Sequence, residues 1–292
     1  MRSRTMFKRM ILGSIAVITA LSFSVSAENF RIATGGEGGG YERQGKIVAH
    51  NVKSQGKKYK VDFVTEVINT SGTIENIEMF NDSLVEAIVV QADGLNVMPL
   101  SRPFKSKVSL TESVLWIHNK AHGYADIEDI EGKKDVLMVL VENSGSIVTM
   151  RSFKNEDSGY EVNYDSAILV DELYDAVDIV ADGTYNGKKV AGVLYVSSSI
   201  PAEIVSDFSS KVAVGEATDA DFNDAQDVEG NPLYSNCKVK SSQLNGMSTS
   251  NSWSDVSTVC VRSMIVYKID FDHKKAHRAV KKAVNKAVRN VT

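Results

Sequence analysis

The sequence has 292 residues, of which 33 are Lys or Arg and 37 are Asp or Glu, giving a formal net charge of −4. This acidic balance argues against nucleic acid as a partner, because neutralising phosphates requires clustered Lys and Arg. The length suits one large domain or two modest ones, and neither a repeat nor a proline-rich linker marks a boundary.

The first residues have the three parts of a secretory signal peptide. Four basic residues lead into the apolar run 10–21, and Val25–Ala27 is a small-residue cleavage site. An uncleaved membrane anchor is the alternative, but the run is shorter than the roughly 20 residues that span a bilayer. We expect the signal peptide 1–27 to be cleaved near Ala27 and the mature chain, 28–292, to be periplasmic. The mature chain has 29 basic residues (33 less 4) and 37 acidic residues, which gives a net charge of −8.

The next segment predicts a strand, a glycine-rich loop and a helix. Residues 30–34 are β-like, five glycines fall within 35–40, and residues 44–52 carry apolar side chains at helical spacing. Glycine leaves no Cβ in the way of a ligand, and a helix N-terminus offers free N–H groups and the positive end of the helix dipole. The segment is typical of an anion-binding loop.

The remaining elements alternate between strands and helices. Strands are predicted over 59–67, 86–91, 108–118, 136–141, 166–170 and 190–196, with helices beginning near 73, 126, 147, 172 and 272. This alternation, together with the unbroken apolar strand at 136–141, favours an α/β fold with parallel sheets.

Four predicted strands end in loops rich in Gly, Ser or Thr, namely 35–40, 70–73, 143–146 and 197–199. In open α/β sheets, ligands bind beyond the carboxyl ends of the strands, where helix N-termini converge. The repetition of these loops in two successive groups of elements predicts two lobes that share one polar cleft.

Two enzymatic interpretations are weaker. Gly40 to Lys46 satisfies most of the P-loop pattern, but Ile47 stands where the Mg²⁺-binding Ser or Thr belongs. Ser144 and Ser198 are candidate nucleophiles of a hydrolase, yet no G-x-S-x-G motif is present, and a capping or ligand-contact role is favoured. We expect no catalytic residue, no metal and no cofactor.

Cys237 and Cys260 are the two cysteines of the sequence. In an oxidising compartment such a pair favours a disulfide, which would close the Ser- and Asn-rich segment between them. Two free thiols are the alternative.

Several of these segments resemble the solute-binding subunits of TRAP transporters, TAXI subfamily. Gly35, Gly36, Gly38 and Tyr41 are similar to the Gly-Gly-x-x-Gly-x-Tyr loop of that family, and 71–76 is similar to its Ser/Gly turn followed by Val-Glu-Asn. The segments 91–93, 144–146 and 199–201 also fit, whereas the sequence beyond about residue 206 shows little similarity.

The resemblance implies an α/β fold of two Rossmann-like lobes with mostly parallel sheets, hinged by crossing strands, as in type II periplasmic binding proteins. We place 28–110 and 220–292 in lobe 1 and 111–219 in lobe 2. The implied function is capture of a small anionic solute, a dicarboxylate or an acidic amino acid, for the membrane permease subunits of a TRAP transporter. We expect the chain to be a monomer.

The expected ligand-binding residues share a position in the glycine loop or in the Ser- and Thr-rich turns. They are Gly36, Gly38, Tyr41, Arg43, Ser71, Gly72, Thr73, Gln91, Ser144, Gly145, Ser146 and Ser199. The chain has Glu42-Arg43 where the family has an aromatic residue and Pro, which makes Arg43 a candidate counter-ion and Glu42 a candidate amine partner. The alternatives are an exported ligand-sensing subunit of a membrane receptor and, as a weaker possibility, a secreted serine hydrolase.

Overall fold

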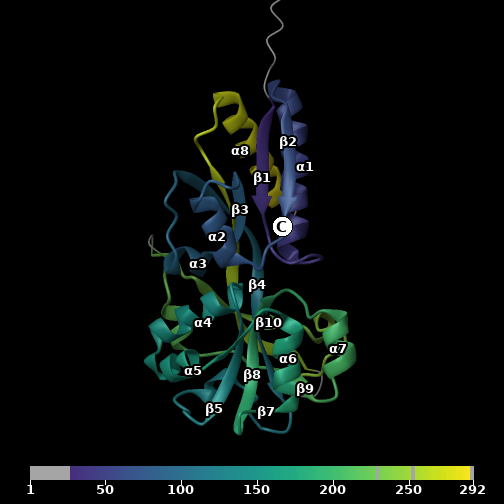
Figure 1. The fold of residues 1–292 in the computed structure, drawn as a ribbon, viewed down its shortest axis with the longest axis vertical. Coiled ribbons are helices and arrows are strands. Elements are labelled where there is room, and N and C mark those ends of the chain that lie inside the picture. Colours follow the sequence, from purple (N-terminus) through teal and green to yellow (C-terminus); the bar gives the residue numbers. More distant parts are fainter. Residues whose placement is uncertain (1–26, 228–229, 251–253, 290–292) are drawn as a thin grey trace, which may run out of the picture.

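The computed structural model describes residues 27–227, 230–250 and 254–289. This part of the chain is an α/β fold whose two lobes are stacked along the long axis of the molecule (Figure 1). The predicted signal peptide, 1–27, lies outside the described residues except for Ala27. Among the described helices, none combines the length and the apolar character that crossing a bilayer requires.

The first lobe holds three parallel strands between two pairs of helices. The strands are β1 (Glu28–Ala33), β2 (Phe63–Ile68) and β3 (Ala87–Gln91), and β1 pairs in parallel with both of the others. The helices are α1 (Gly40–Tyr59), α2 (Thr73–Asn81), α3 (Ala92–Val97) and α8 (Lys274–Arg289). One face of the sheet buries Phe30 against α1 and α8, and the other buries Ile88 against α2.

Helix α8 is amphipathic, as its sequence predicts. Its buried face consists of small side chains, among them Ala276, Ala279 and Ala283, which lie in one core with residues of α1. Its Lys and Arg side chains lie on the exposed side of the helix. The small residues allow close packing of the two helices on this face of the lobe.

The second lobe repeats the layered arrangement. Its strands are β5 (Val136–Val141), β6 (Ile168–Val170), β7 (Thr184–Tyr185), β8 (Lys188–Ser197) and β9 (Val212–Gly215). Its helices are α4 (Gly145–Glu156), α5 (Glu161–Asp165), α6 (Leu173–Asp182) and α7 (Ala202–Phe208), with short 3₁₀ turns at 127–130, 158–160, 221–224 and 241–243. Strand β5 pairs in parallel with β6 and β8, and α4 and α6 contribute to separate cores.

Two long strands join the lobes. They are β4 (Phe104–Asn119) and β11 (Val256–Lys268), which pair with each other in antiparallel fashion. One part of β11 pairs with β3 in the first lobe, and the distal part of β4 pairs with β8 and β9 in the second. The result is a mixed sheet in the order β2-β1-β3-β11-β4-β8-β5-β6. The predicted α/β class, with two lobes joined by crossing strands, is confirmed.

The packing of β10 (Tyr234–Val239) bears on the boundary between the lobes. This strand pairs with the first half of β11, and Tyr234 and Val259 are buried in a core with residues of α4. From the sequence we placed 220–292 in lobe 1. We propose instead that β10 and the first half of β11 belong to lobe 2, and that the chain returns to lobe 1 along β11.

The disulfide lies within this returning segment. Cys237 on β10 and Cys260 on β11 are joined, as the sequence predicts, and they are 23 residues apart. In the chain-entropy account, closing a loop of this length stabilises the fold by about 3 kcal/mol. The bond therefore fixes β10 to the crossing strand.

Gly45 allows α1 to lie directly on the first-lobe sheet. A Cβ at this position would lie 2.4 Å from Cγ2 of Thr34. Alanine in an exposed helix is favoured over glycine by about 1 kcal/mol, but overpacking of a tight contact costs about 2 kcal/mol. We therefore expect Gly45→Ala to lower the free energy of unfolding by about 1 kcal/mol, measured by urea denaturation. Gly36→Ala is the control, because a Cβ there meets no atom within 4 Å. A Gly45→Ala protein that is more stable than the unmodified protein would contradict the tight contact between α1 and the sheet.

Candidate ligand-binding site

Three helices begin at the junction of the lobes, each shortly after the carboxyl end of a parallel strand. Helix α1 follows β1, α2 follows β2, and α4 follows β5. The N-caps of α1 and α2 are Gly39 and Gly72, which provide no capping side chain, and the N-cap of α4 is Ser144. Free N–H groups and the positive ends of the helix dipoles from both lobes therefore face one region.

Three adjoining cavities occupy this region, and Gly36 and Tyr195 line all of them. The central cavity has a volume of about 140 Å³ and lies between the starts of α1, α2 and α4. We call the second, of about 530 Å³, the acidic chamber, because Glu75, Asp171 and Glu172 line it. The third, of about 380 Å³, is the outer chamber beside the glycine loop.

The structure brings together the twelve residues that the sequence analysis selected as ligand contacts. The central cavity is lined by Gly36, Tyr41, Ser71, Gly72, Thr73, Gln91, Ser144, Gly145 and Ser146. The outer chamber adds Gly38, Arg43 and Ser199. The selected residues thus come from both lobes, and their contact with a ligand stays a prediction.

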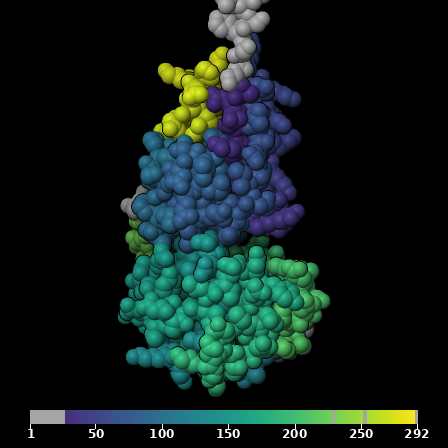
Figure 2. Space-filling model, in the orientation of Figure 1, coloured from purple at the N-terminus to yellow at the C-terminus, as the bar shows by residue number. Residues whose placement is uncertain are grey.

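The two lobes touch at the central cavity. Gly72 has a φ of 134°, which favours glycine, and a Cβ there would lie 3.4 Å from Cα of Ser144. A Cβ on Gly145 would lie only 2.1 Å from Oε1 of Gln91. On the face shown in Figure 2 the first lobe rests directly on the second. The two lobes are therefore in contact at these two glycines, one from each lobe.

A buried carboxyl group links the lobes behind the cavity. Asp93, which begins the first turn of α3, accepts hydrogen bonds from the hydroxyls of Thr149 and Tyr234, each at 2.7 Å. Burial raises the pKa of Asp93 to about 6, although these hydroxyls oppose the shift. Because Thr149 lies on α4 and Tyr234 on β10, the carboxyl group holds α3 to the second lobe.

The glycine loop is held by its own helix. Glu42 is buried, accepts a hydrogen bond from the N–H of Gly38 at 3.0 Å, and pairs with Lys46 at 2.8 Å. Lys46 and this N–H lower the pKa of Glu42. Arg43 donates from Nη1 to the carbonyl oxygen of Gly38 at 2.8 Å. Glu42 thus braces the loop, whereas Arg43 both supports the loop and lines the outer chamber.

Ser144 has the geometry of a helix cap. Its hydroxyl donates to the carbonyl oxygen of Val141 at 2.7 Å and accepts from the N–H of Ser146 at 3.1 Å. In the described part of the chain, no histidine is among the residues that line the three cavities. The hydroxyl of Ser144 is thus engaged in capping α4.

Four side chains of the central cavity, those of Glu112, Tyr195, Val196 and Ser197, were not predicted from the sequence. Tyr195 extends from β8 and Glu112 from the crossing strand β4. Glu112 is 6% exposed, and burial raises its pKa to about 7. The hydroxyl of Tyr41 opposes this shift and the charge of Asp93 adds to it. No motif marks Glu112, because it lies in the middle of a long extended segment and reaches the cavity only through the crossing of β4.

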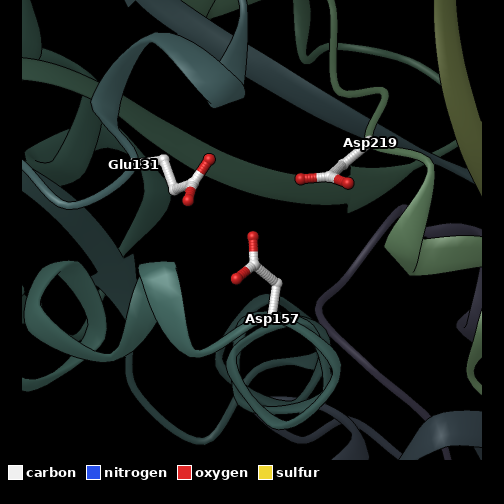
Figure 3. Close-up of side chains that lie close together, drawn as sticks. All are labelled: Glu131, Asp157 and Asp219. Atoms are coloured by element: carbon white, nitrogen blue, oxygen red, sulfur yellow. The ribbon is translucent and has the colours of Figure 1, made fainter.

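Three carboxylates form a separate cluster in the second lobe. Glu131, Asp157 and Asp219 point toward one another (Figure 3), and one oxygen atom of each lies within 4.8 Å of the others. Asp157 accepts from the N–H of Gly159 at 2.8 Å, and Asp219 accepts from the hydroxyl of Tyr160 at 3.1 Å. Protein groups thus satisfy part of this cluster, and we assign no ligand to it.

No family model matches this sequence, and no curated protein matches it. Matching solved structures include the GluR0 ligand-binding core in complex with L-glutamate, at 8% identity, 92% coverage of this chain, 99% of that chain and a TM-score of 0.46. A glycine-to-alanine mutant of arginine-bound ArgBP from T. maritima matches at 9% identity, with 90% coverage of this chain, 96% coverage of that chain and a TM-score of 0.47. The effector-binding domain of QuiR in complex with shikimate matches at 13% identity, with 91% coverage of this chain, 98% coverage of that chain and a TM-score of 0.47. These are ligand-binding domains, and all three TM-scores lie below 0.5.

The buried carboxyl of Glu112 makes the stability of the ligand-free protein depend on pH. Its pKa rises from 4.5 to about 7 on folding, so the folded state binds the proton more tightly and is favoured at low pH. The free energy of unfolding should therefore fall by up to about 3 kcal/mol between pH 4.5 and pH 8 from this group. Urea denaturation at several pH values measures this fall.

Glu112→Gln keeps the shape of the side chain and removes its titration. We expect the fall in stability between pH 4.5 and pH 8 to shrink in this variant, while the contribution of Asp93 remains. Glu37→Gln, on the exposed part of the glycine loop, is the matched control and should leave the fall unchanged. An unchanged pH dependence in Glu112→Gln would show that Glu112 is not the buried group responsible.

Proposed function

We propose that this chain is an exported, periplasmic solute-binding protein that captures a small carboxylate-bearing solute between its two lobes. The observation that carries the proposal is the convergence of three helix N-termini, from both lobes, on one central cavity. Backbone N–H groups and helix dipoles stabilise an anion there without a metal or a basic side chain. Burial of the solute would then hold the lobes together.

The lining of the cavity supports capture of a small polar molecule. The hydroxyls of Ser71, Thr73 and Ser146 lie around a volume of about 140 Å³ and add hydrogen-bonding groups to the backbone donors. Pre-formed clefts with a few convergent polar groups bind small ligands in this way. Closure of hinged lobes around a ligand is a common transition in such folds.

We further propose that the loaded protein delivers its solute to the membrane permease subunits of a TRAP transporter. The support is the sequence resemblance to the TAXI subfamily in the glycine loop and in 71–76, segments that line the central cavity, together with the predicted signal peptide. In this proposal the protein carries out no catalysis, and Ser144 acts as a cap and a ligand contact.

A ligand screen tests the proposal. Thermal unfolding of the mature protein would be followed with small carboxylates and amino acids, and we expect one chemical group of solutes to raise Tm without being consumed. Gly145→Ala should weaken binding about tenfold, because the new methyl group displaces the side-chain amide of Gln91 that lines the central cavity.

Glu156→Ala, an exposed change in the same helix, is the control and should bind as the unmodified protein does. Stabilisation by no carboxylate would contradict capture. Consumption of a solute that Ser144→Ala abolishes would instead support the hydrolase.

A further inference from the structure

The charges around the three cavities are unequal. The acidic side chains that line them are those of Glu37, Glu75, Glu112, Asp171 and Glu172, whereas Arg43 is the one basic side chain among the described residues that do so. Near a protein surface, opposite charges attract and like charges repel equally at the same distance. A dicarboxylate would bring two negative charges into this surrounding, and the helix N-termini and Arg43 would have to outweigh the repulsion.

Of these acidic residues, Glu112 is the one that lines the central cavity. A Cβ built on Gly40 would lie 3.7 Å from Oε1 of Glu112, so the carboxyl group faces the first residue of α1. The positive end of α1 therefore already has a protein carboxyl group beside it. The N-termini of α2 and α4, at Thr73 and Gly145, are left to bind a carboxylate of the solute.

Within the described part of the protein, two further polar groups at the central cavity are buried without a well-formed hydrogen bond. Gln91 is 1% exposed, and its Oε1 is buried without a hydrogen bond. The hydroxyl of Tyr41 is also buried without a well-formed hydrogen bond, although it lies close to Glu112. Unsatisfied buried polar groups are costly, so a bound group with several N–H donors would stabilise this end of the cavity.

We propose that Glu112 binds an ammonium group of the solute, whose carboxylate lies at the N-termini of α2 and α4, so that the solute is an amino acid with a side chain that is not acidic. This inference rests on the proposed function and specifies its substrate class. An ammonium group offers three donors, which suit Glu112 and Gln91. Asp171 and Glu172 disfavour a second carboxylate in the acidic chamber.

The proposal determines how affinity varies with pH. Glu112 must be ionised to pair with an ammonium group, and its pKa is raised to about 7 in the free protein. The charged and titratable groups around it are Tyr41 and Arg43 of α1, Asp93 of α3 and Tyr195 of β8. The association constant of the amino acid should therefore rise about tenfold from pH 6 to pH 8, whereas a dicarboxylate would bind more weakly as pH rises.

Titration calorimetry of the mature protein with the twenty L-amino acids, succinate and glutarate tests the substrate class. The best amino acid would be compared with the 2-hydroxy acid that carries the same side chain. We expect the amino acid to bind at least about 30-fold more tightly, because the hydroxy acid lacks the charge-assisted hydrogen bond. Equal affinity of the pair would overturn the proposal.

Glu112→Gln should weaken binding of the amino acid about 30-fold and remove the rise with pH. Glu156→Gln, an exposed change on α4 away from the three cavities, is the matched control and should change neither. If Glu112→Gln does not fold, the pH dependence of the association constant in the unmodified protein tests the proposal. An association constant that does not rise between pH 6 and pH 8 would overturn it. Tightest binding of succinate or glutarate would overturn this inference but leave capture intact, and binding of none of the probes would overturn both.

Discussion

The convergence of helix N-termini between the lobes is the arrangement on which the rest of the structure depends. Each lobe has parallel strands, and the helix that follows such a strand begins at its carboxyl end. Strands β4 and β11 pair with each other while reaching both lobes, so they set the carboxyl ends of the two sheets toward one another. A cavity surrounded by positive dipole ends is the consequence, and it exists only when both lobes are present.

Closing two lobes over such a cavity buries polar groups. Some of these groups have hydrogen-bond partners within the protein, and others are without one among the described residues. Oδ2 of Asp93 receives two hydroxyl hydrogen bonds across the interface, while Oδ1 of the same carboxyl is buried without one. In contrast, Oε1 of Gln91 and the hydroxyl of Tyr41 are buried without well-formed bonds. Groups of the first kind stabilise the closed arrangement by themselves. Groups of the second kind are costly until a ligand supplies the missing partners, which couples binding to closure.

Glycine has two separate roles in this protein. Gly72 and Gly145 lie where the lobes meet, and a methyl group on Gly145 would overlap Gln91. Gly45 lies on the buried side of α1 against Thr34, and Lys46 beside it pairs with Glu42. The resemblance of 40–46 to a P-loop is therefore explained by helix packing and by an ion pair.

The sequence by itself determined the α/β class, most of the strands and helices, and the glycine- and serine-rich turns that line the cleft, because periodicity, helix capping and backbone freedom are local properties. The tertiary structure was needed to show that Tyr234 and Val259 pack in a core with α4, that Glu42 braces its own loop, and that Glu112 and Tyr195 line the central cavity. These outcomes depend on how distant strands cross and on which side chains become buried. Burial also raises the pKa of Glu112, so the chemistry of this residue is a product of the fold.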